Sequence, residues 1–308
     1  MCLDSVNLDD ASLLTLSQGL IQMPSIKGLM IGNNKFTCEG ISQLAQNLFH
    51  CINLEKIDLS CNAIGDLGAQ VLSTVLPNMK NLRTINLSQI STGPLGGLRI
   101  AKALESCDLL EEILFSLNKL EKEVVYQLAV ALPMMASLKI LDLHSCNLEA
   151  DGGSALMAAL QSCWQIEDLC LSENTLGEHC LLQLAEGLQN FKQLRKINLK
   201  LCGISDCVSR SLAVGFGCCK NLEEIILSWN YIGDDGSLAL ACALKEMRKL
   251  KKLDLDTNRI TECGAEAIAI ALSGCSGIKV VRLWKNSVSK AMEEKLHSKD
   301  SRLHFSFF

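Results

Sequence analysis

One repeat length runs through almost the whole chain. Segments of the form LxxLxLxxNxL, such as LKKLDLDTNRI from Leu250, recur every 28 residues without insertion or deletion. The first positions of the units are Ile26, Leu54, Leu82, Leu110, Leu138, Ile166, Leu194, Leu222, Leu250 and Ile278. A fixed period of about 20–50 residues is typical of repeat proteins, in which each unit buries its apolar face only against its neighbours. We therefore expect ten stacked units.

Each unit combines a strand pattern with a helix pattern. Positions four and six are apolar, as Leu253 and Leu255 show, and side chains two residues apart point to the same face of a strand. The second half, as in Gly264–Cys275, spaces apolar residues three and four apart, which predicts an amphipathic helix. Because helices are wider than strands, the sequence predicts an α/β fold, a horseshoe solenoid with parallel strands on the concave side and helices on the convex side.

A side-chain amide recurs at position nine, in the bend that follows each strand. The residues are Asn34, Asn62, Asn118, Asn174, Asn230, Asn258 and Asn286, with Cys146 and Cys202 as substitutes. An amide can bond the backbone groups of such a bend, and a thiol can do so weakly. Ile90 is the exception, so we predict the lowest local stability at residues 88–97.

These motifs resemble the leucine-rich repeats of the ribonuclease-inhibitor type over nearly the whole chain. The uniform units, with segments such as Leu59–Leu76 and Leu227–Leu244, are most similar to the C-terminal repeats of NOD-like receptors (NLRs), the class II transactivator type included. This resemblance implies a leucine-rich repeat horseshoe that binds a protein ligand on its concave face. It also implies a role in innate immunity through ligand sensing, autoinhibition or transactivator regulation.

We expect a single leucine-rich repeat domain over residues 1–308. A half-unit, residues 1–25, comes before the ten full units, and together they would supply about eleven strands. A chain that begins inside a unit suggests a fragment or short isoform of a longer receptor. Its nucleotide-binding domain would lie upstream, because no GxxxxGKS/T loop occurs here. Lys290–His297 predicts a last helix, and residues 303–308 are apolar enough to form a C-terminal cap.

Charge and cysteine content exclude several classes of function. The chain has 29 Lys+Arg and 34 Asp+Glu, a formal net charge of −5, so no direct binding of nucleic acid is expected. The 16 cysteines show no paired spacing and lie mostly within apolar patterns. They predict reduced, buried thiols in a cytoplasmic protein, with the nucleus as a further location. No apolar run reaches the roughly 18 residues of a membrane-spanning helix, so no membrane insertion is expected.

No cofactor, metal site or catalytic group is predicted. There is no CxxC pair, and no histidine has zinc-site spacing with a cysteine. His179 and Cys180 are adjacent, so on a helix they point about 100° apart, and no third group would orient them. We therefore expect no enzyme activity.

Two columns of side chains alternate along the array. Position two alternates in sign from Lys27 and Glu55 as far as Lys251, after which Lys279 breaks the alternation. Because parallel strands lie about 4.8 Å apart, these charges predict a ladder of ion pairs rather than a docking strip. Position 26 alternates cysteine with methionine or phenylalanine, which predicts alternating packing volume in the core.

The candidate binding site lies in the last four units. Positions five and seven must face the concave side, because side chains alternate along a strand. These positions are small in the first units, whereas the last four gather aromatic, aliphatic and charged residues typical of binding hot spots. The predicted partner-binding residues, on or beside that side, are Lys200, Ile226, Trp229, Asp254, Asp256, Arg282, Trp284 and Lys285. The alternative is that Trp229 and Trp284 only cover the strand edge near the C-terminal cap.

Three functions are compatible with the sequence. The first is a non-catalytic protein-binding scaffold of the NLR kind. The second is a ribonuclease inhibitor, suggested by the fold and the cysteine content, although that family is more acidic and alternates its unit lengths. The third resembles the Ran GTPase-activating protein, although the long acidic C-terminal tail associated with that family is missing.

Overall fold

The computed structural model describes residues 1–306. Its internal contacts divide the chain into two compact units, Met1–Cys163 and Trp164–Phe308, which are described one at a time. Both units repeat the strand and helix that the sequence predicts. The fold is therefore the predicted leucine-rich repeat architecture of alternating parallel strands and helices.

In the first unit, five parallel strands follow one another in chain order. They are β1 (Gly28–Met30), β2 (Lys56–Asp58), β3 (Thr84–Asn86), β4 (Glu112–Leu114) and β5 (Ile140–Asp142). The helices are α1 (Asp10–Leu20), α2 (Cys38–Leu48), α3 (Gly65–Val75), α4 (Pro94–Leu104), α5 (Lys122–Ala131) and α6 (Ala150–Leu160), with short 3-10 helices η1 (Leu76–Asn78) and η2 (Leu132–Met134). Equivalent positions of successive repeats pair with each other, since Leu29 pairs with Ile57 and Ile57 pairs with Ile85.

The second unit continues the same plan with six parallel strands. They are β6 (Asp168–Cys170), β7 (Lys196–Asn198), β8 (Glu224–Ile226), β9 (Lys252–Asp254), β10 (Val280–Arg282) and β11 (Leu303–His304). The helices are α7 (Gly177–Gly187), α8 (Asp206–Cys218), α9 (Asp234–Leu244), α10 (Glu262–Leu272) and α11 (Lys290–Lys299), and η3 (Leu188–Asn190) follows α7. The strict repeat length thus fixes which strands pair.

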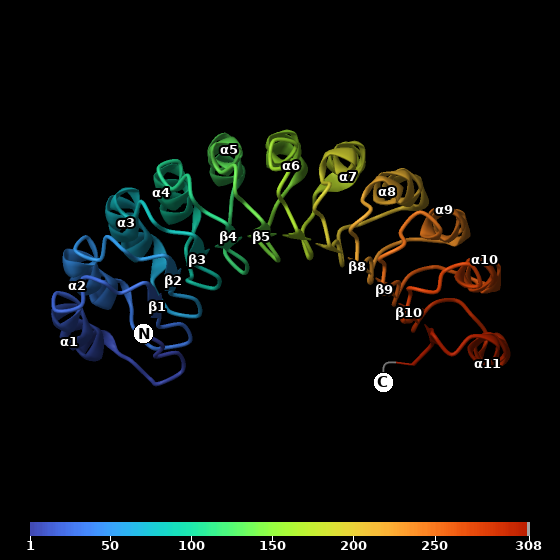
Figure 1. Ribbon diagram of the computed structural model, residues 1–308, viewed down its shortest axis with the longest axis horizontal. Coiled ribbons are helices and arrows are strands. Elements are labelled where there is room, and N and C mark those ends of the chain that lie inside the picture. Colours follow the sequence, from blue (N-terminus) through green and yellow to red (C-terminus); the bar gives the residue numbers. More distant parts are fainter. Residues whose placement is uncertain (307–308) are drawn as a thin grey trace. The chain divides into compact units, whose positions relative to one another are not determined.

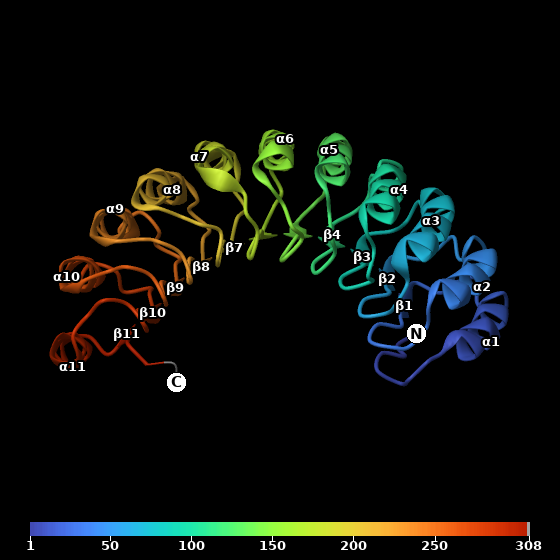
Figure 2. The same ribbon diagram turned by 180° about the vertical axis from the view of Figure 1, so that it is seen from behind.

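Within each unit the strands form one layer and the helices the other. Figure 1 and Figure 2 show the strands on the inner side of each unit's curve and the helices on its outer side, as predicted. The core fills the space between the two layers. Leu253 and Leu255, at positions four and six, are fully buried, and so are the alternating side chains of position 26, such as Cys107 and Met135.

The asparagines at position nine bond the bends of two successive repeats, as predicted. The Asn230 amide donates to the carbonyls of Leu227 and Leu199, both at 2.9 Å. Its Oδ1 accepts the N–H groups of Cys202 and Ile204, both at 3.0 Å. One side chain therefore satisfies backbone groups that the strand–helix junction would otherwise bury without partners.

Ile90 occupies position nine without a side-chain amide, and the hydrogen bond that is lost belongs to the bend of the preceding repeat. The Ile64 N–H has no amide oxygen opposite it and donates instead to the carbonyl of Asn62, two residues back in its own bend, at 2.9 Å. Gly65 then takes a left-handed φ of 62° at the start of α3, a conformation that glycine adopts without a steric penalty. We therefore expect the lower local stability at this bend, one repeat before residues 88–97, although the Gly65 N–H still donates to the Ile90 carbonyl at 2.9 Å.

Position eight has a backbone conformation that the sequence pattern did not indicate. All ten residues at this position, none of them glycine, have a φ between 51° and 61°. Non-glycine residues adopt this left-handed region rarely. The chain therefore turns at the carboxyl end of strands β1 to β10, and the side chains of position eight, Trp229 and Lys285 among them, lie along that edge of the strand layer.

The predicted charge ladder forms within each unit. Glu111 lies 2.5 Å from Arg83 and 2.7 Å from Lys139, and in the second unit Arg195 lies 2.7 Å from Glu223. The hydrogen bonds from Lys139 and Arg83 hold the pKa of Glu111 below its ordinary value. Exposed pairs of this kind contribute about 0.2–1 kcal/mol each, so the ladder supports the register without dominating stability.

The cysteines are free thiols throughout, but not all of them are buried. Eight are buried, as predicted. The exposed ones are Cys2, Cys207, Cys218, Cys242 and Cys263. The prediction of burial is wrong for these five, because four lie at outward positions of helices α8 to α10 and the other lies in the N-terminal half-unit.

The two ends of the repeat array differ from expectation in one respect. The N-terminal half-unit contributes α1 and an isolated bridge between Cys2 and Met30 rather than a strand. The eleventh strand is instead β11, where Leu303 is fully buried, so the expected C-terminal cap forms over the described residues. Phe307 and Phe308 lie outside the described residues.

Candidate protein-binding site

Three neighbouring strands of the second unit bring part of the predicted site together. Ile226, Asp254 and Arg282 end β8, β9 and β10, and they lie side by side in register. All three are partly exposed, whereas the residues before and after them are buried. The row therefore faces away from the helices, as the alternation of side chains along a strand requires.

Two carboxylates hold Arg282 in place. Arg282 Nε donates to Asp256 Oδ2 at 2.7 Å, its Nη2 lies 2.6 Å from the same oxygen, and Asp254 Oδ2 lies 3.9 Å from Nε. Asp256 Oδ1 accepts the N–H of Trp284 at 2.8 Å. Only 5% of Asp256 is exposed, so its carboxylate fixes the arginine and the tryptophan and has little surface for a partner.

Asp254 is the member of this group whose charge is least well compensated. Burial raises the pKa of its carboxyl, and the nearby Asp256 carboxylate adds to the rise, while the hydrogen bond from the Asp256 N–H and the charge of Arg282 oppose it. A buried carboxylate is costly in its charged form unless cations and donors surround it. The group therefore depends on Arg282 for its charge balance.

Trp229, Trp284 and Lys285 form what we call the aromatic–cation cluster. The Lys285 ammonium lies 5.5 Å from the centre of the Trp229 ring and 5.3 Å from the centre of a Trp284 ring. A cation within about 6 Å of an aromatic ring is attracted to its face. Trp229 is nevertheless 44% exposed, so the cluster offers a large aromatic surface at the edge of the second unit.

Tyr231 and Arg259 form a second pair on this unit that the sequence analysis missed. The Arg259 guanidinium lies 4.5 Å from the centre of the Tyr231 ring, and Tyr231 is 53% exposed. Both occupy position ten of neighbouring repeats, so a comparison of that column would have found them. Among residues 1–306, neither Arg259 nor Lys285 has a carboxylate within ion-pair distance.

A family model described as Leucine Rich repeat matches residues 50–73, 135–157, 218–241 and 246–269. The chain is built from leucine-rich repeats. Each matched segment contains one strand and most of the helix that follows it. The match therefore covers the same unit that the 28-residue period defines.

Several proteins resemble parts of this leucine-rich repeat chain. Protein NLRC5 from Ictalurus punctatus is 34% identical over 161 residues, which are 52% of this chain and 9% of that protein. NACHT, LRR and PYD domains-containing protein 5 from Homo sapiens is 28% identical over 239 residues, 67% of this chain and 20% of that protein. Ran GTPase-activating protein 1 from Saccharomyces cerevisiae is 31% identical over 167 residues, 50% of this chain and 41% of that protein. The chain spans less than half of each relative.

An internalin from Listeria monocytogenes has the same fold as this leucine-rich repeat chain. The two structures superpose with a TM-score of 0.55 over 97% of this chain and 95% of the internalin. They are 16% identical in sequence, so the likeness concerns the fold alone.

Lys200 does not join the other predicted site residues of the leucine-rich repeat chain. Its Nζ lies 2.8 Å from Glu173 Oε1, in the neighbouring repeat. Asp256 thus links Arg282 to Trp284 of the aromatic–cation cluster, whereas Lys200 has its own ion pair with Glu173.

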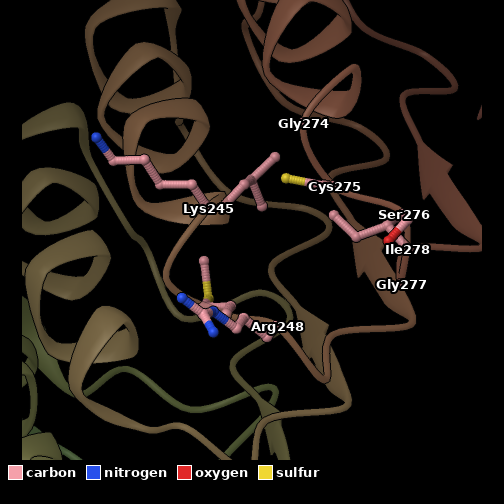
Figure 3. Close-up of a pocket in the computed structure, with 9 residues that line it drawn as sticks. Lys245, Arg248, Gly274, Cys275, Ser276, Gly277 and Ile278 are labelled. Atoms are coloured by element: carbon pink, nitrogen blue, oxygen red, sulfur yellow. The ribbon is translucent and has the colours of Figure 1, made fainter.

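A separate pocket of about 350 Å³ lies at the turn before β10. Lys245 and Arg248 line one side and Gly274–Ile278 the other, and Figure 3 shows the Lys245 side chain running away from that turn. The pocket therefore does not gather its charges around one point.

Within residues 1–306 no cluster of side chains has the composition of a metal site. None of the described helices combines the length and the apolar character needed to cross a membrane.

Proposed function

We propose that this chain is a non-catalytic protein-binding scaffold of NLR-type innate immune signalling, and that its aromatic–cation cluster contacts the partner. The observation that carries the proposal is the Lys285 ammonium 5.5 and 5.3 Å from the centres of the Trp229 and Trp284 rings, at an exposed edge of the second unit. The similarity to Protein NLRC5 and to the NACHT, LRR and PYD domains-containing protein supports the NLR part. In a longer form with an upstream nucleotide-binding domain, the chain would serve ligand sensing, autoinhibition or regulation in the cytoplasm or nucleus.

The chemistry of this edge suits a protein ligand. Trp229 and Tyr231 present rigid rings that lose little conformational entropy on binding. Lys285 and Arg259 are held by aromatic faces rather than by carboxylates, so their charges can meet acidic groups of a partner. The surface therefore offers apolar area and positive charge together, which is the composition of a binding hot spot.

Site-specific photo-cross-linking tests the proposal even before the partner is identified. A benzophenone amino acid replaces Tyr231 in one full-length chain and Tyr126, which is 45% exposed on α5, in a matched chain. We expect one protein to be cross-linked in cells through position 231 and not through position 126. Equal cross-linking through both positions, or none through position 231, would contradict the proposed site.

Two enzyme assays separate the alternative functions. A ribonuclease inhibitor would suppress hydrolysis of RNA by pancreatic ribonuclease at equimolar concentration. A protein that resembles Ran GTPase-activating protein 1 in activity would accelerate hydrolysis of GTP bound to Ran. We expect neither effect, and a clear positive result in either assay would replace the proposal.

A further inference from the structure

A groove on the helical face of the first unit serves neither the fold nor the proposed function. It has a volume of about 400 Å³ and lies between α3 and α4, with Gln127 of α5 also lining it. Leu67 of α3 and Leu95 of α4 line the groove and are 69% and 74% exposed. Isolated apolar side chains are common on surfaces, but two large ones that share a hollow are characteristic of interaction sites.

The repeat itself shows that folding does not require leucine at these places. Both leucines occupy position 14, in the first turn of the helix, where α2, α5 and α6 carry Glu39, Glu123 and Asp151 and α1 carries Ala11. A carboxylate in the first turn is favoured by the helix dipole. Leu95 leaves the first turn of α4 without a carboxylate, whereas Asp66 provides one in α3 beside Leu67. The exposed side chains of Leu67 and Leu95 gain little burial in either helix.

Positive charge lies beside the apolar end of the groove. Leu95, Leu98, Arg99 and Lys102 follow the helical spacing i, i+3, i+4, i+7 and so form one stripe along α4. Within residues 1–306, neither Arg99 nor Lys102 has a carboxylate within ion-pair distance. The acid that lines the groove, Asp66, is already engaged, because its Oδ1 accepts two backbone N–H groups at the start of α4, at 2.7 and 2.9 Å.

We propose that this groove docks an acidic amphipathic helix of a partner protein. Apolar side chains of that helix would pack on Leu67 and Leu95, and Asp or Glu one to two turns further along would face Arg99 and Lys102. The stripe from Leu95 to Lys102 is about 10 Å long at 1.5 Å per residue, so two turns of a partner helix span it. Anchors at this spacing are how helices bind in grooves.

The shape and charge of the surface favour a helix over a lipid bilayer. Leu67 and Leu95 line a hollow between two helices, which fits the rounded surface of a helix better than a flat bilayer. The net charge of −5 also opposes approach to an anionic membrane. The inference is independent of the proposed function, because the groove lies on helices of the first unit and the aromatic–cation cluster on the second unit.

Selection from a peptide library tests the inference directly. Phage that display an 18-residue helical peptide with one randomised face are selected on the full chain, and the enriched peptides are measured by fluorescence polarisation. We expect them to combine apolar residues with Asp or Glu. The double variant Leu67→Ser/Leu95→Ser should bind them roughly ten-fold more weakly. The control is Val130→Ser, because Val130 is exposed on α5 and lies outside the groove, and this variant should bind the peptides with unchanged affinity. Circular dichroism verifies that each variant is folded.

A charge reversal supplies the second readout. On the chain with Arg99→Glu and Lys102→Glu, the same library should enrich basic helices instead of acidic ones. Trp229→Ala should leave binding unchanged, so the outcome is separate from that of the proposed function. The inference is overturned if the enriched peptides show no acidic bias, bind the Leu67→Ser/Leu95→Ser chain equally well, or depend on Trp229. It is also overturned if vesicles of phosphatidylserine and phosphatidylcholine bind the chain through the two leucines.

Discussion

At the scale of single residues, the candidate site includes a carboxylate, Asp254, that the fold mostly buries. Asp254 Oδ1 accepts the N–H of Asp256 at 3.1 Å, while Arg282 balances only part of its charge. Because burial raises the pKa of Asp254, its ionised form opposes folding. The site therefore keeps an unfavourable charge that contributes to the placement of Arg282.

Asp254→Asn should change how the free energy of unfolding depends on pH. Between the ordinary carboxyl pKa of 3.8 and the raised folded pKa, the folded chain binds more protons than the unfolded chain. The contribution of this group therefore falls as pH rises through that window. Urea unfolding of both chains at several pH values from about 4 to 7 should show the variant gaining stability relative to the wild type as pH rises. A difference that stays constant with pH would show that Asp254 has an ordinary pKa.

Burial also determines which thiols can react. Burial raises the pKa of Cys107 and Cys163 to about 11 and that of Cys202 and Cys219 to about 12, so these thiols are protonated and shielded at neutral pH. Iodoacetamide should label the five exposed cysteines in the native chain and all 16 after denaturation without reductant. Mass spectrometry reports both counts. Native labelling at Cys107 or Cys219, or protection after denaturation, would refute this assignment.

At the scale of elements, the bends after the strands depend on hydrogen bonds to an asparagine of the following repeat. Ile90 N–H still donates to Asn118 Oδ1 at 3.2 Å, and Asp66 accepts the N–H of Gly93 at 2.7 Å, so residues 88–97 are well bonded. The amide that Ile90 lacks would have bonded the bend of the preceding repeat, where the Ile64 N–H now has no side-chain acceptor. In a solenoid such a bend can open locally because each repeat contacts only its neighbours.

Hydrogen exchange should therefore be faster at the Ile64 amide than at the Ile232 amide. Both residues are buried, but Ile232 N–H donates to Asn258 Oδ1 at 3.0 Å, whereas Ile64 N–H bonds only within its own bend. A hydrogen bond worth about 1 kcal/mol corresponds to roughly five-fold in exchange rate. Equal protection of the two amides, measured by NMR, would mean that packing alone secures the bend.

At the scale of the whole molecule, the repeat period was enough to predict the fold. The fixed length predicts the strands, the helices and the buried leucines, because each unit can fold only against a neighbour in the same register. The left-handed backbone at position eight could not be predicted, since residues as different as Leu201, Trp229 and Lys285 share it. That conformation comes from the stacking of the repeats and leaves no common side chain to recognise.

The site was predicted less completely than the fold. The alternation of side chains along a strand predicts which face of the strand layer Asp256 occupies. It does not predict how far the side chain is buried, which depends on Arg282 and Trp284 in the next repeat. The contact of Tyr231 with Arg259 also joins two repeats and escapes inspection of one unit at a time. Features that recur from repeat to repeat, the charge ladder included, could thus be predicted, whereas contacts made once between two particular repeats required the structure.

The most direct test of the proposed binding site is the affinity of the cross-linked partner for variants of the full chain. Isothermal titration calorimetry should show Trp229→Ala weakening binding by about 2 kcal/mol or more, which is roughly 30-fold in Kd, because buried aromatic anchors contribute that much. Ser60→Ala, at a position-seven residue of the first unit, should leave the Kd unchanged. Equal weakening by both substitutions, or an unchanged Kd for Trp229→Ala, would contradict the assignment of binding to the aromatic–cation cluster.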